Sequence, residues 1–280
     1  MCQCLQFYCL DINHKTVTGN EALYHNGEVI KRDGYTTDVF TDAAVEFIEE
    51  KASDPFFLYV AYNSMLPPYA PPGQEDKKDS FDLWKNGTRA DYVASVEHLD
   101  KSVGRILDTL EQQNLTDETV VVLTYDHGGA ELATSGKFFH GFGTLWEGGI
   151  RVPMILNWPA NVEKGIVCSE ATILMDVAPT VLTAAGVKPD QPMDGLNLLA
   201  DNNLSNEPRT LFWRIDLASG NEALVQRLQR AVRRGKWKYL CDGLEFLYDL
   251  EEDPGERHNL SYQHPELLAE LRELSKGDWY

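Results

Sequence analysis

Short, almost wholly apolar segments alternate with helical patterns between about residues 35 and 186. Residues 55–62, 119–125 and 152–158 are each too short for a typical helix and too apolar for a strand with one face in water. Each of them therefore predicts a strand that is covered on both faces. This feature limits the possible folds most strongly, because fully covered strands require layers of helices on either side of a sheet.

The helical patterns lie between these segments. Apolar residues recur at helical spacing over 38–50 and 93–110, and residues 173–185 predict a third helix that ends before Gly186. Helices interleaved with covered strands predict an α/β domain, in which a mostly parallel sheet carries helices on both faces.

The pattern changes after Pro192. Residues 201–208 are polar and rich in turn formers, so we expect a boundary between a domain at 1–200 and a smaller one at 201–280. The smaller domain should be an antiparallel α+β unit with one amphipathic helix over 265–274. Its predicted strands are 210–215, 228–232, 237–241 and 245–248.

Charge excludes several classes of partner. The 280 residues have a formal net charge of −19, and the calculated pI is about 4.7. Nucleic acids and anionic membrane surfaces attract basic patches, so neither is expected as a partner. No apolar run reaches the roughly 18 to 20 residues of a membrane span. The first fifteen residues also lack the features of a secretory signal.

One candidate site directly follows the predicted strand 119–125. Asp126 and His127 precede two glycines, Gly128 and Gly129, that permit a sharp turn. In an open α/β sheet, ligands bind beyond the carboxyl ends of the strands. This position therefore favours a site for a hard metal cation or an anionic substrate. The alternative is that Asp126 is only an N-cap or a turn former.

A second glycine-rich stretch covers residues 141–153. Its structural interpretation is a tight crossover into the strand at 152–158, with Trp146 as a core anchor. Lys137 and His140 precede it, and both are candidates to reach back toward Asp126; an exposed loop lysine is the more usual finding.

At these stretches the chain resembles the sulfatase family of the alkaline-phosphatase-like superfamily. The YDL-x-x-DP-x-E-x-x-NL pattern and GTLWEGGIRVP are quite specific to this family. The matching segments are GYTTDVFTDAAVEFIE at 34–49, PFFLYVAYN at 55–63, YVASVEHLDKSVGRILDTLEQ at 92–112, VVLTYDHGG at 121–129, GTLWEGGIRVPMILNWP at 143–159 and YDLEEDPGERHNL at 248–260.

The resemblance implies functions for two residues. Asp126 matches a calcium-binding aspartate, and His127 stands where a second ligand or a sulfate contact is expected. A carboxylate suits Ca²⁺ well, whereas an imidazole suits it less, so His127 is also a candidate substrate-binding residue. Sulfatases use a formylglycine made from the Cys (or Ser) of a Cys-X-Pro-Ser-Arg motif. None of the five cysteines here stands in that motif.

The resemblance also implies two replaced catalytic positions. A histidine that helps protonate the leaving group is usual where this chain has Leu66, and a lysine is usual where it has Phe142. Leucine cannot donate a proton, and phenylalanine cannot neutralise a sulfate oxygen.

We therefore predict a truncated alkaline-phosphatase-like sheet followed by the small α+β subdomain, with half of a Ca²⁺ site at Asp126 and His127. The implied reaction is hydrolysis of sulfate monoesters, and the isolated chain should be inactive. A sulfated small molecule or glycan would bind if an N-terminal half completed the site. The alternatives are a non-catalytic binding or regulatory protein, and a phosphodiesterase or phosphonate hydrolase of the same superfamily. Family members are usually secreted, periplasmic or lysosomal, and the sequence leaves the compartment open.

Overall fold

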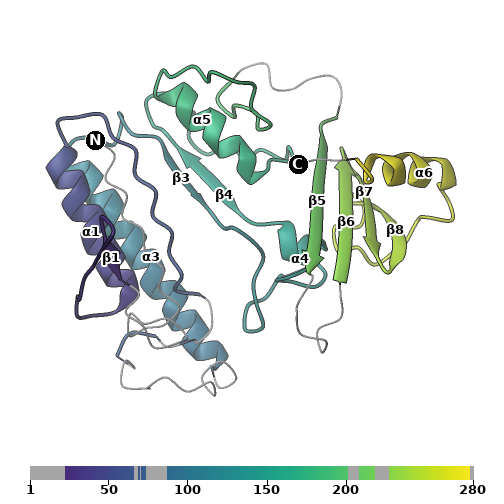
Figure 1. The fold of residues 1–280 in the computed structure, drawn as a ribbon, viewed down its shortest axis with the longest axis horizontal. Helices are drawn as coiled ribbons and strands as arrows, with labels where there is room; N and C mark the ends of the chain where they lie inside the picture. The colour runs from purple at the N-terminus through teal and green to yellow at the C-terminus, as the bar shows by residue number, and fades with distance from the viewer. Residues whose placement is uncertain are drawn as a thin grey trace. The chain divides into compact units, whose positions relative to one another are not determined.

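A computed structural model describes residues 23–65, 69, 71–73, 87–200, 208–217 and 227–277. The chain divides into two compact units, Met1–Thr119 and Val120–Tyr280, and each is described separately (Figure 1). These compact units are defined by contacts within the chain, and the division into domains at 1–200 and 201–280 remains a prediction.

The first unit is built on two packed helices, α1 (Thr36–Lys51) and α3 (Arg89–Gln112). A short antiparallel pair, β1 (Tyr24–His25) and β2 (Glu28–Val29), precedes them. The predicted helix at 38–50 is confirmed, and its apolar face is buried at Val39, Phe40 and Ile48. These side chains form the core of the unit because they recur at helical spacing on one side of α1.

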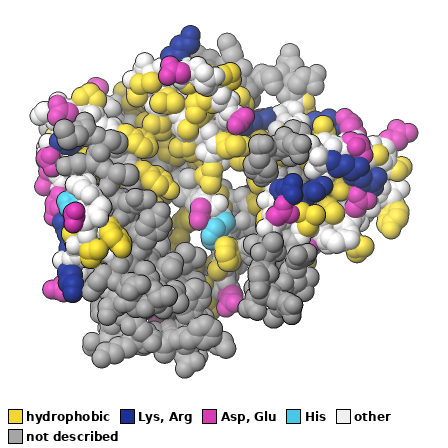
Figure 2. Space-filling view, in the orientation of Figure 1, with side chains coloured by type: hydrophobic (Ala, Val, Ile, Leu, Met, Phe, Trp, Pro, Cys, Tyr) yellow, Lys and Arg dark blue, Asp and Glu magenta, His cyan; other side chains and the backbone are white. Residues whose placement is uncertain are grey.

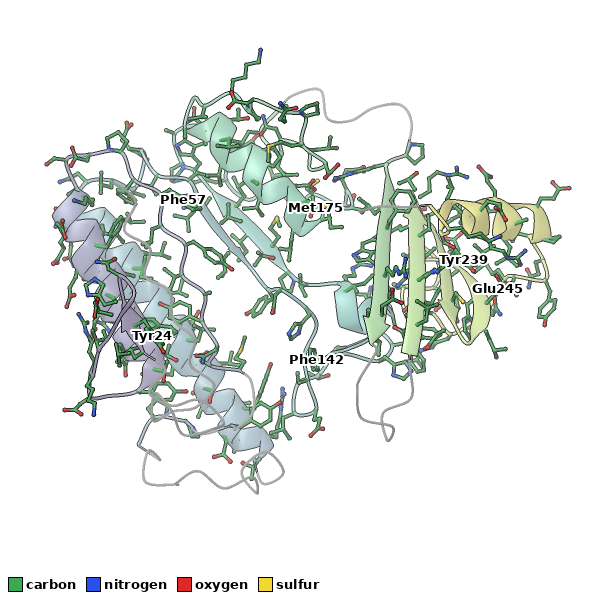
Figure 3. All side chains as sticks on the ribbon, in the orientation of Figure 1. Tyr24, Phe57, Phe142, Met175, Tyr239 and Glu245 are labelled. Atoms are coloured by element: carbon green, nitrogen blue, oxygen red, sulfur yellow. The ribbon has the colours of Figure 1, made fainter. Side chains whose placement is uncertain are left out.

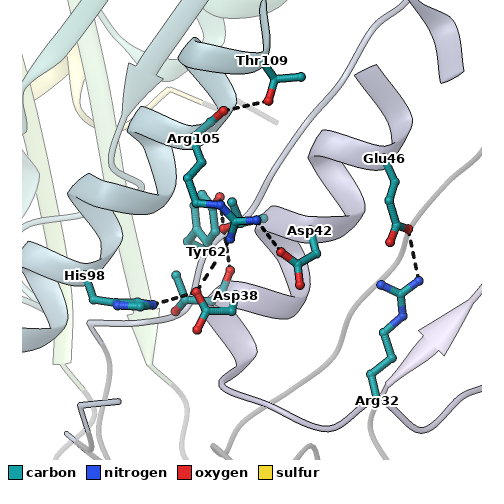
Figure 4. A network of polar contacts seen from close by, with 10 residues as sticks. Arg32, Asp38, Asp42, Glu46, Tyr62, His98, Arg105 and Thr109 are labelled. Atoms are coloured by element: carbon teal, nitrogen blue, oxygen red, sulfur yellow. Dashed lines mark hydrogen bonds and ion pairs between the residues drawn. The ribbon is translucent and has the colours of Figure 1, made fainter. Parts of the chain in front are cut away.

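Polar contacts join α1 to α3 (Figure 4). Asp38 Oδ1 lies 2.9 Å from His98 Nε2, and Arg105 Nη2 donates to Asp42 Oδ1 at 2.6 Å. The Tyr62 hydroxyl is hydrogen-bonded to Thr41 Oγ1 at 2.9 Å, so the extended segment before residue 63 is joined to α1 as well.

The predicted helix at 93–110 is confirmed, but its buried side differs from the apolar stripe. Ser95, Ser102 and Thr109 are buried, whereas Val93 and Leu107 are about two-fifths exposed, at 39% and 41%. Small hydroxyl residues tolerate this burial because their side chains bond the preceding turn; for example, Ser95 Oγ donates to the Asp91 carbonyl oxygen at 3.0 Å.

The covered strand expected at 55–62 is wrong for the described structure. The segment is extended but belongs to no sheet, and its side chains alternate between half-buried and exposed. Phe57 and Tyr59 are 63% and 78% exposed. An apolar run indicates a tendency to be buried, but it does not specify which strand will pair with it.

In the second unit, β3 (Val121–Thr124) and β4 (Met154–Asn157) confirm two predicted strands but form an antiparallel pair. The expectation that they are covered on both faces is wrong for the described structure, since Leu123 and Ile155 are 38% and 57% exposed. All sheets among the described residues are antiparallel, so the expected mostly parallel sheet is wrong for this part of the chain. The loop between β3 and β4 folds back along itself, because the Gly128 amide donates to the Gly149 carbonyl oxygen at 2.8 Å. The chain therefore returns beside its own outward path and pairs in the opposite direction.

The helix predicted at 173–185 is a 3₁₀ turn (Leu174–Asp176) followed by α5 (Val177–Ala184). Gly186 has φ of +69°, as expected for a residue that ends a helix in the left-handed region. The Val187 amide donates to the Leu182 carbonyl oxygen at 2.8 Å, which completes a Schellman motif.

The four strands predicted in the C-terminal part are confirmed. They form one antiparallel sheet in the order β5-β6-β7-β8, and α6 (Pro265–Leu274) packs against it. The strands are β5 (Thr210–Leu217), β6 (Arg227–Arg234), β7 (Trp237–Asp242) and β8 (Leu244–Asp249). No described helix combines the length and apolarity that crossing a bilayer would demand.

The two faces of this sheet have separate cores. Val232, Tyr239 and Leu247 pack with Leu271 of α6. On the opposite face, Ala231, Leu240 and Tyr248 pack with Leu145 and Trp146 from the β3–β4 loop. Trp146 is 5% exposed and its Nε1 donates to Asp242 Oδ2 at 3.1 Å, so the predicted core anchor is confirmed.

A buried ionic cluster also holds this loop on the sheet. Lys238 of β7 is fully buried, and its Nζ lies 2.9 Å from Glu147 Oε1 and 2.8 Å from Glu256 Oε1. Glu147 begins the short helix α4 (Glu147–Ile150), and its amide donates to Glu256 Oε2 at 2.6 Å. One ammonium group therefore connects the loop, the sheet and the segment after β8.

The two carboxylates of this cluster respond differently to burial. Burial alone would raise the pKa of Glu147, but the attraction and hydrogen bond of Lys238, with help from Arg233 and Arg151, hold it below the usual range. Burial raises the pKa of Glu256, and Lys238 offsets this only in part. The contribution of Glu147 to stability is thus present above its unfolded-state pKa and lost as the pH falls through its folded pKa. The contribution of Glu256 is present at low pH and is lost as the pH rises through its raised pKa.

We expect Lys238→Met to lower the free energy of unfolding by about 3–5 kcal/mol at pH 7, because two buried carboxylates lose their only shared cation. Urea denaturation followed by tryptophan fluorescence measures the change. Lys276→Met is the matched control, since Lys276 is an exposed lysine paired with the exposed Glu273. A surface pair contributes little, so this control should lose far less stability. Equal losses in the two variants would contradict the importance of the buried cluster.

Candidate functional site

Asp126 lies just beyond the carboxyl end of β3, where the sequence places it. Its side chain is 80% exposed, and its Oδ1 accepts a hydrogen bond from the His127 amide at 3.0 Å. One carboxylate oxygen thus fixes the turn while the other remains accessible. No helix begins at Asp126, so the residue forms a turn and not an N-cap, and this structural role is compatible with a functional one because the two use different oxygens.

His127 is oriented by its own turn. Its Nδ1 donates to the Gly128 carbonyl oxygen at 2.9 Å, which requires a proton on Nδ1. Its Nε2 lies 3.3 Å from Asp126 Oδ2. When Nε2 is also protonated, the two side chains form an ion pair; when it is not, Nε2 is a free electron-pair donor next to the carboxylate.

Phe142 lies on the β3–β4 loop (Figure 3), and its ring packs against the ring of His127. The centroids of the two rings are 4.4 Å apart and the planes are inclined at 43°. The Phe142 amide donates to the Gly129 carbonyl oxygen at 3.0 Å, and the ring is 55% exposed. The position where the resemblance implies a lysine thus presents an aromatic surface beside the imidazole.

Interlocking glycines hold the two halves of this loop together. A Cβ on Gly128 would lie 1.9 Å from the Gly148 carbonyl oxygen, and one on Gly148 would lie 2.2 Å from the His140 carbonyl oxygen. A Cβ on Gly149 would meet the Thr144 carbonyl oxygen at 2.2 Å. A backbone carbonyl group can approach this closely only because each of these glycines has no Cβ. The glycine-rich crossover is therefore confirmed as a structural feature that fixes the Asp126–His127 turn.

Lys137 and His140 have other neighbours. The Lys137 ammonium lies 5.7 Å from the centroid of the Phe138 ring, and the Arg151 guanidinium lies 4.7 Å from the same ring. The His140 ring lies against Phe139, with centroids 4.3 Å apart. The structure brings Asp126, His127 and Phe142 together, whereas the catalytic roles of Lys137 and His140 remain predictions.

Leu66 lies outside the described residues. The contact between His127 and Phe142 was not predicted, although both residues were noted separately. Glu147 was also missed as the residue that holds the loop on the sheet; its signal was a charged residue inside an otherwise apolar, glycine-rich stretch.

The described residues fit Ca²⁺ only in part. Asp126 offers a hard, exposed oxygen ligand, but Ca²⁺ requires six to eight oxygen ligands and His127 supplies nitrogen. Within the part of the chain that the structure describes, no group of three or more histidine, cysteine or acidic residues converges to hold a metal. Asp126 therefore fits as one ligand of a larger set.

A sulfatase family model matches residues 6–187, and the model "N-sulphoglucosamine sulphohydrolase, C-terminal" matches residues 138–276. The chain belongs to the sulfatase family. The first match covers β3 and the Asp126–His127 turn, and the second covers the glycine-rich loop and the C-terminal sheet.

Relatives in this family have related activities. The chain is 28% identical to an N-acetylgalactosamine-6-O-sulfatase of Bacteroides thetaiotaomicron, over 87% of this chain and 51% of the relative. It is also 28% identical to the human N-acetylgalactosamine-6-sulfatase, over 85% and 51%. A sulfatase of Formosa agariphila is 30% identical over 82% and 47%. The chain thus spans about half the length of the relatives it matches.

Solved structures show the same fold. The structure of Ps i-CgsB in complex with k-i-k-neocarrahexaose superimposes with a TM-score of 0.78 and 29% identity, over 92% of this chain and 58% of that one. The phosphonate monoester hydrolase of Agrobacterium radiobacter has a TM-score of 0.62 at 20% identity, over 86% and 62%, which shows the fold alone. The described part of the sulfatase chain therefore has a mixed α/β structure of the alkaline-phosphatase-like type.

We expect Gly128→Ala to lower the free energy of unfolding by about 1–3 kcal/mol, because the added Cβ overlaps the Gly148 carbonyl group. Gly104→Ala is a matched control within α3, where an added Cβ has no heavy atom within 4 Å. Alanine in a helix interior should stabilise that variant by about 0.5–1 kcal/mol. Urea denaturation measures the free energy of unfolding of both variants. If Gly128→Ala unfolds with the same free energy as the parent chain, the two halves of the loop are not closely packed in solution.

Proposed function

We propose that this chain contributes one side of the site of a sulfate monoester hydrolase. The observation that carries the proposal is the exposed Asp126 carboxylate at the end of β3, fixed by its bond to the His127 amide. Membership of the sulfatase family and the named activities of the relatives support a sulfate ester as the substrate class.

The chain's own residues have limited roles in this reaction. Asp126 is the proposed Ca²⁺ ligand, and bound Ca²⁺ would supply positive charge to the oxygens of a sulfate group. His127, held by the Gly128 carbonyl group, would direct Nε2–H toward a sulfate oxygen. Neither residue is a nucleophile. In the family, the nucleophile comes from a formylglycine motif, and these 280 residues contain no such motif.

The 280-residue polypeptide alone should therefore not turn over sulfate esters. Without a nucleophile, the covalent route is absent, and each lost cationic contact lowers the rate by roughly 10²- to 10³-fold. An N-terminal half carrying the nucleophile, in the same or another polypeptide, would complete the site. The completed site would act on a sulfated small molecule or glycan.

We expect the purified chain to release no 4-nitrophenol from 4-nitrophenyl sulfate above the level of Asp126→Ala, with 5 mM CaCl₂ present. Titration calorimetry should nevertheless show weak Ca²⁺ binding that Asp126→Asn weakens about tenfold or more, because one carboxylate ligand is lost. Asp190→Asn, an exposed acid outside the turn, is the matched control and should bind as the parent chain does. Turnover above Asp126→Ala would refute the inactivity, and Ca²⁺ binding that is indifferent to Asp126 would refute the site.

A second candidate function is a non-catalytic binding or regulatory role. The exposed ring of Phe142 against His127 favours it, because this contact provides apolar surface where the resemblance implies a cation. An aromatic ring adds contact area for a ligand but no charge to stabilise a sulfate. The third possibility, a phosphodiesterase or phosphonate hydrolase, shares the fold and has no further support in this site.

Phe142→Lys separates the first two functions. A lysine there should tighten binding of N-acetylgalactosamine 6-sulfate by about tenfold, because a charge-assisted hydrogen bond contributes about 1.5–3 kcal/mol. Phe142→Leu is the control that removes the ring without adding charge, and it should leave sulfate binding unchanged. If Phe142→Leu instead abolishes binding of the sugar, the aromatic surface itself is the binding element and the non-catalytic function is favoured.

A further inference from the structure

The C-terminal sheet reverses the charge of the rest of the chain. The whole sequence carries a formal net charge of −19. In β5 and β6, by contrast, Asp216 is the single acid, and the basic residues are Arg214, Arg227, Arg230, Arg233 and Arg234. Figure 2 shows Lys and Arg side chains gathered over this part of the molecule. Basic side chains this close together repel one another, so acidic groups or bound anions are expected beside them.

Most of the described basic side chains in this region already have one. Arg234 pairs with Glu270 of α6 at 2.7 Å, and Arg214 pairs with Asp216 on its own strand. Lys238 lies between the two buried glutamates, and the Arg233 Nε donates to the Gly235 carbonyl oxygen at 3.0 Å. Arg234, Lys238 and Arg233 are therefore not available as an anion site without breaking a native contact, whereas the Arg214–Asp216 pair is exposed, with side chains 39% and 51% accessible, and such a surface pair contributes little.

Arg230 is different. Its Nε is buried and has no hydrogen-bond partner among the described residues. In the register of the sheet, Arg230 lies directly opposite Arg214 on β5 and opposite Cys241 on β7. Like charges directly opposite one another destabilise a strand pair, and an unsatisfied buried donor is unfavourable as well. Asp216 offsets the charge of Arg214 only, and one anion placed between the two guanidinium groups would offset the charge of Arg230 as well.

The nearest acid along this row does not fill that role. Glu245 is opposite Cys241 on β8, one strand further from Arg230. Its carboxylate accepts hydrogen bonds from both Arg272 Nε and Nη2, at 2.5 Å each, and from the Tyr239 hydroxyl at 2.9 Å (Figure 3). Arg272 thus neutralises Glu245, and among the residues that the structure describes Arg230 forms no ion pair.

This row belongs to a different face from the Asp126 loop. Side chains alternate between the two faces of a sheet, so Arg230 shares a face with Val232, which packs against Leu271 of α6. The neighbouring residue Gln229 faces the other way, and its Oε1 accepts a hydrogen bond from the Leu145 amide at 2.7 Å. The Arg214–Arg230 pair and the Asp126–His127 turn are therefore separate sites.

We propose that Arg230, together with Arg214, binds an oxyanion, a sulfate or carboxylate group, carried by an anionic glycan. The planar guanidinium group presents parallel N–H donors that match two oxygens of either group, and two opposed arginines can hold one anion from both sides. The choice of a glycan rests on the proposed function, whereas the oxyanion site rests only on the sheet. In a hydrolase of sulfated glycans, this site would hold a second anionic group of the same glycan molecule.

The test is titration calorimetry on the full 280-residue chain at constant ionic strength, set with NaCl. The probes are sodium sulfate, a chondroitin 6-sulfate hexasaccharide and a hyaluronan hexasaccharide, which carries carboxylates only. We expect the parent chain to bind one or both oligosaccharides, and Arg230→Gln to weaken this binding about tenfold or more. Arg234→Gln removes the same charge from the same strand, but from an arginine already paired with Glu270, and should change the affinity less than about twofold.

Each outcome is decisive. Binding of chondroitin sulfate alone identifies sulfate as the recognised group, and binding of both oligosaccharides identifies the carboxylate. The proposal is overturned if no probe binds at millimolar concentration, or if Arg230→Gln and Arg234→Gln weaken binding equally, which would indicate diffuse attraction. The titrations contain EDTA and no added calcium, so a failure here is distinct from a failure of the Ca²⁺-dependent sulfatase site. Should thermal unfolding show that Arg230→Gln is not folded, Arg214→Gln is measured against the same control.

Discussion

The buried ammonium group of Lys238 connects three segments of the second unit that are far apart in sequence. Glu147 lies 91 residues from Lys238, and the Glu147 amide bonds to Glu256 across 109 residues. Removing three charged groups from water is costly, so the cluster is stable only because each charge has a close partner of opposite sign. The same requirement makes it specific, because a shifted loop would leave a buried carboxylate unpaired.

The position of the candidate site follows from this constraint. Glu147 is next to Gly148 and Gly149. The backbone of these two glycines packs against Gly128 and against residues 139–144 of the same loop. Once Glu147 is fixed on the sheet, these glycine contacts fix the opposite side of the loop. The Asp126–His127 turn is therefore held by a cluster of buried charges that does not take part in its chemistry, which is how a rigid scaffold positions an exposed functional group.

The parts of the structure that depend on local sequence could be predicted. The four C-terminal strands alternate in hydrophobicity and are separated by clear turns. Gly186 ends α5 because glycine readily adopts the left-handed conformation that closes a helix. Strand direction and partners could not be predicted, because an apolar run such as 55–62 shows that it avoids water but not what will cover it. The Lys238 cluster was also beyond prediction, since nothing local to Glu147 or Glu256 indicates a shared lysine.

The distribution of charge has consequences for how this chain would recognise an anionic glycan. At the Asp126 turn, the exposed groups are a carboxylate and an aromatic ring, so without a bound cation that surface repels a sulfate group. On the α6 face of the C-terminal sheet, the Nε of Arg230 has no hydrogen-bond partner among the described residues, whereas Arg234 is paired with Glu270. A polyanion with several charged groups would be attracted to the second surface whether or not the first holds its metal. Binding and chemistry would then depend on different residues. Loss of catalytic groups at the Asp126 turn would leave the Arg230 surface with its own function in binding the glycan.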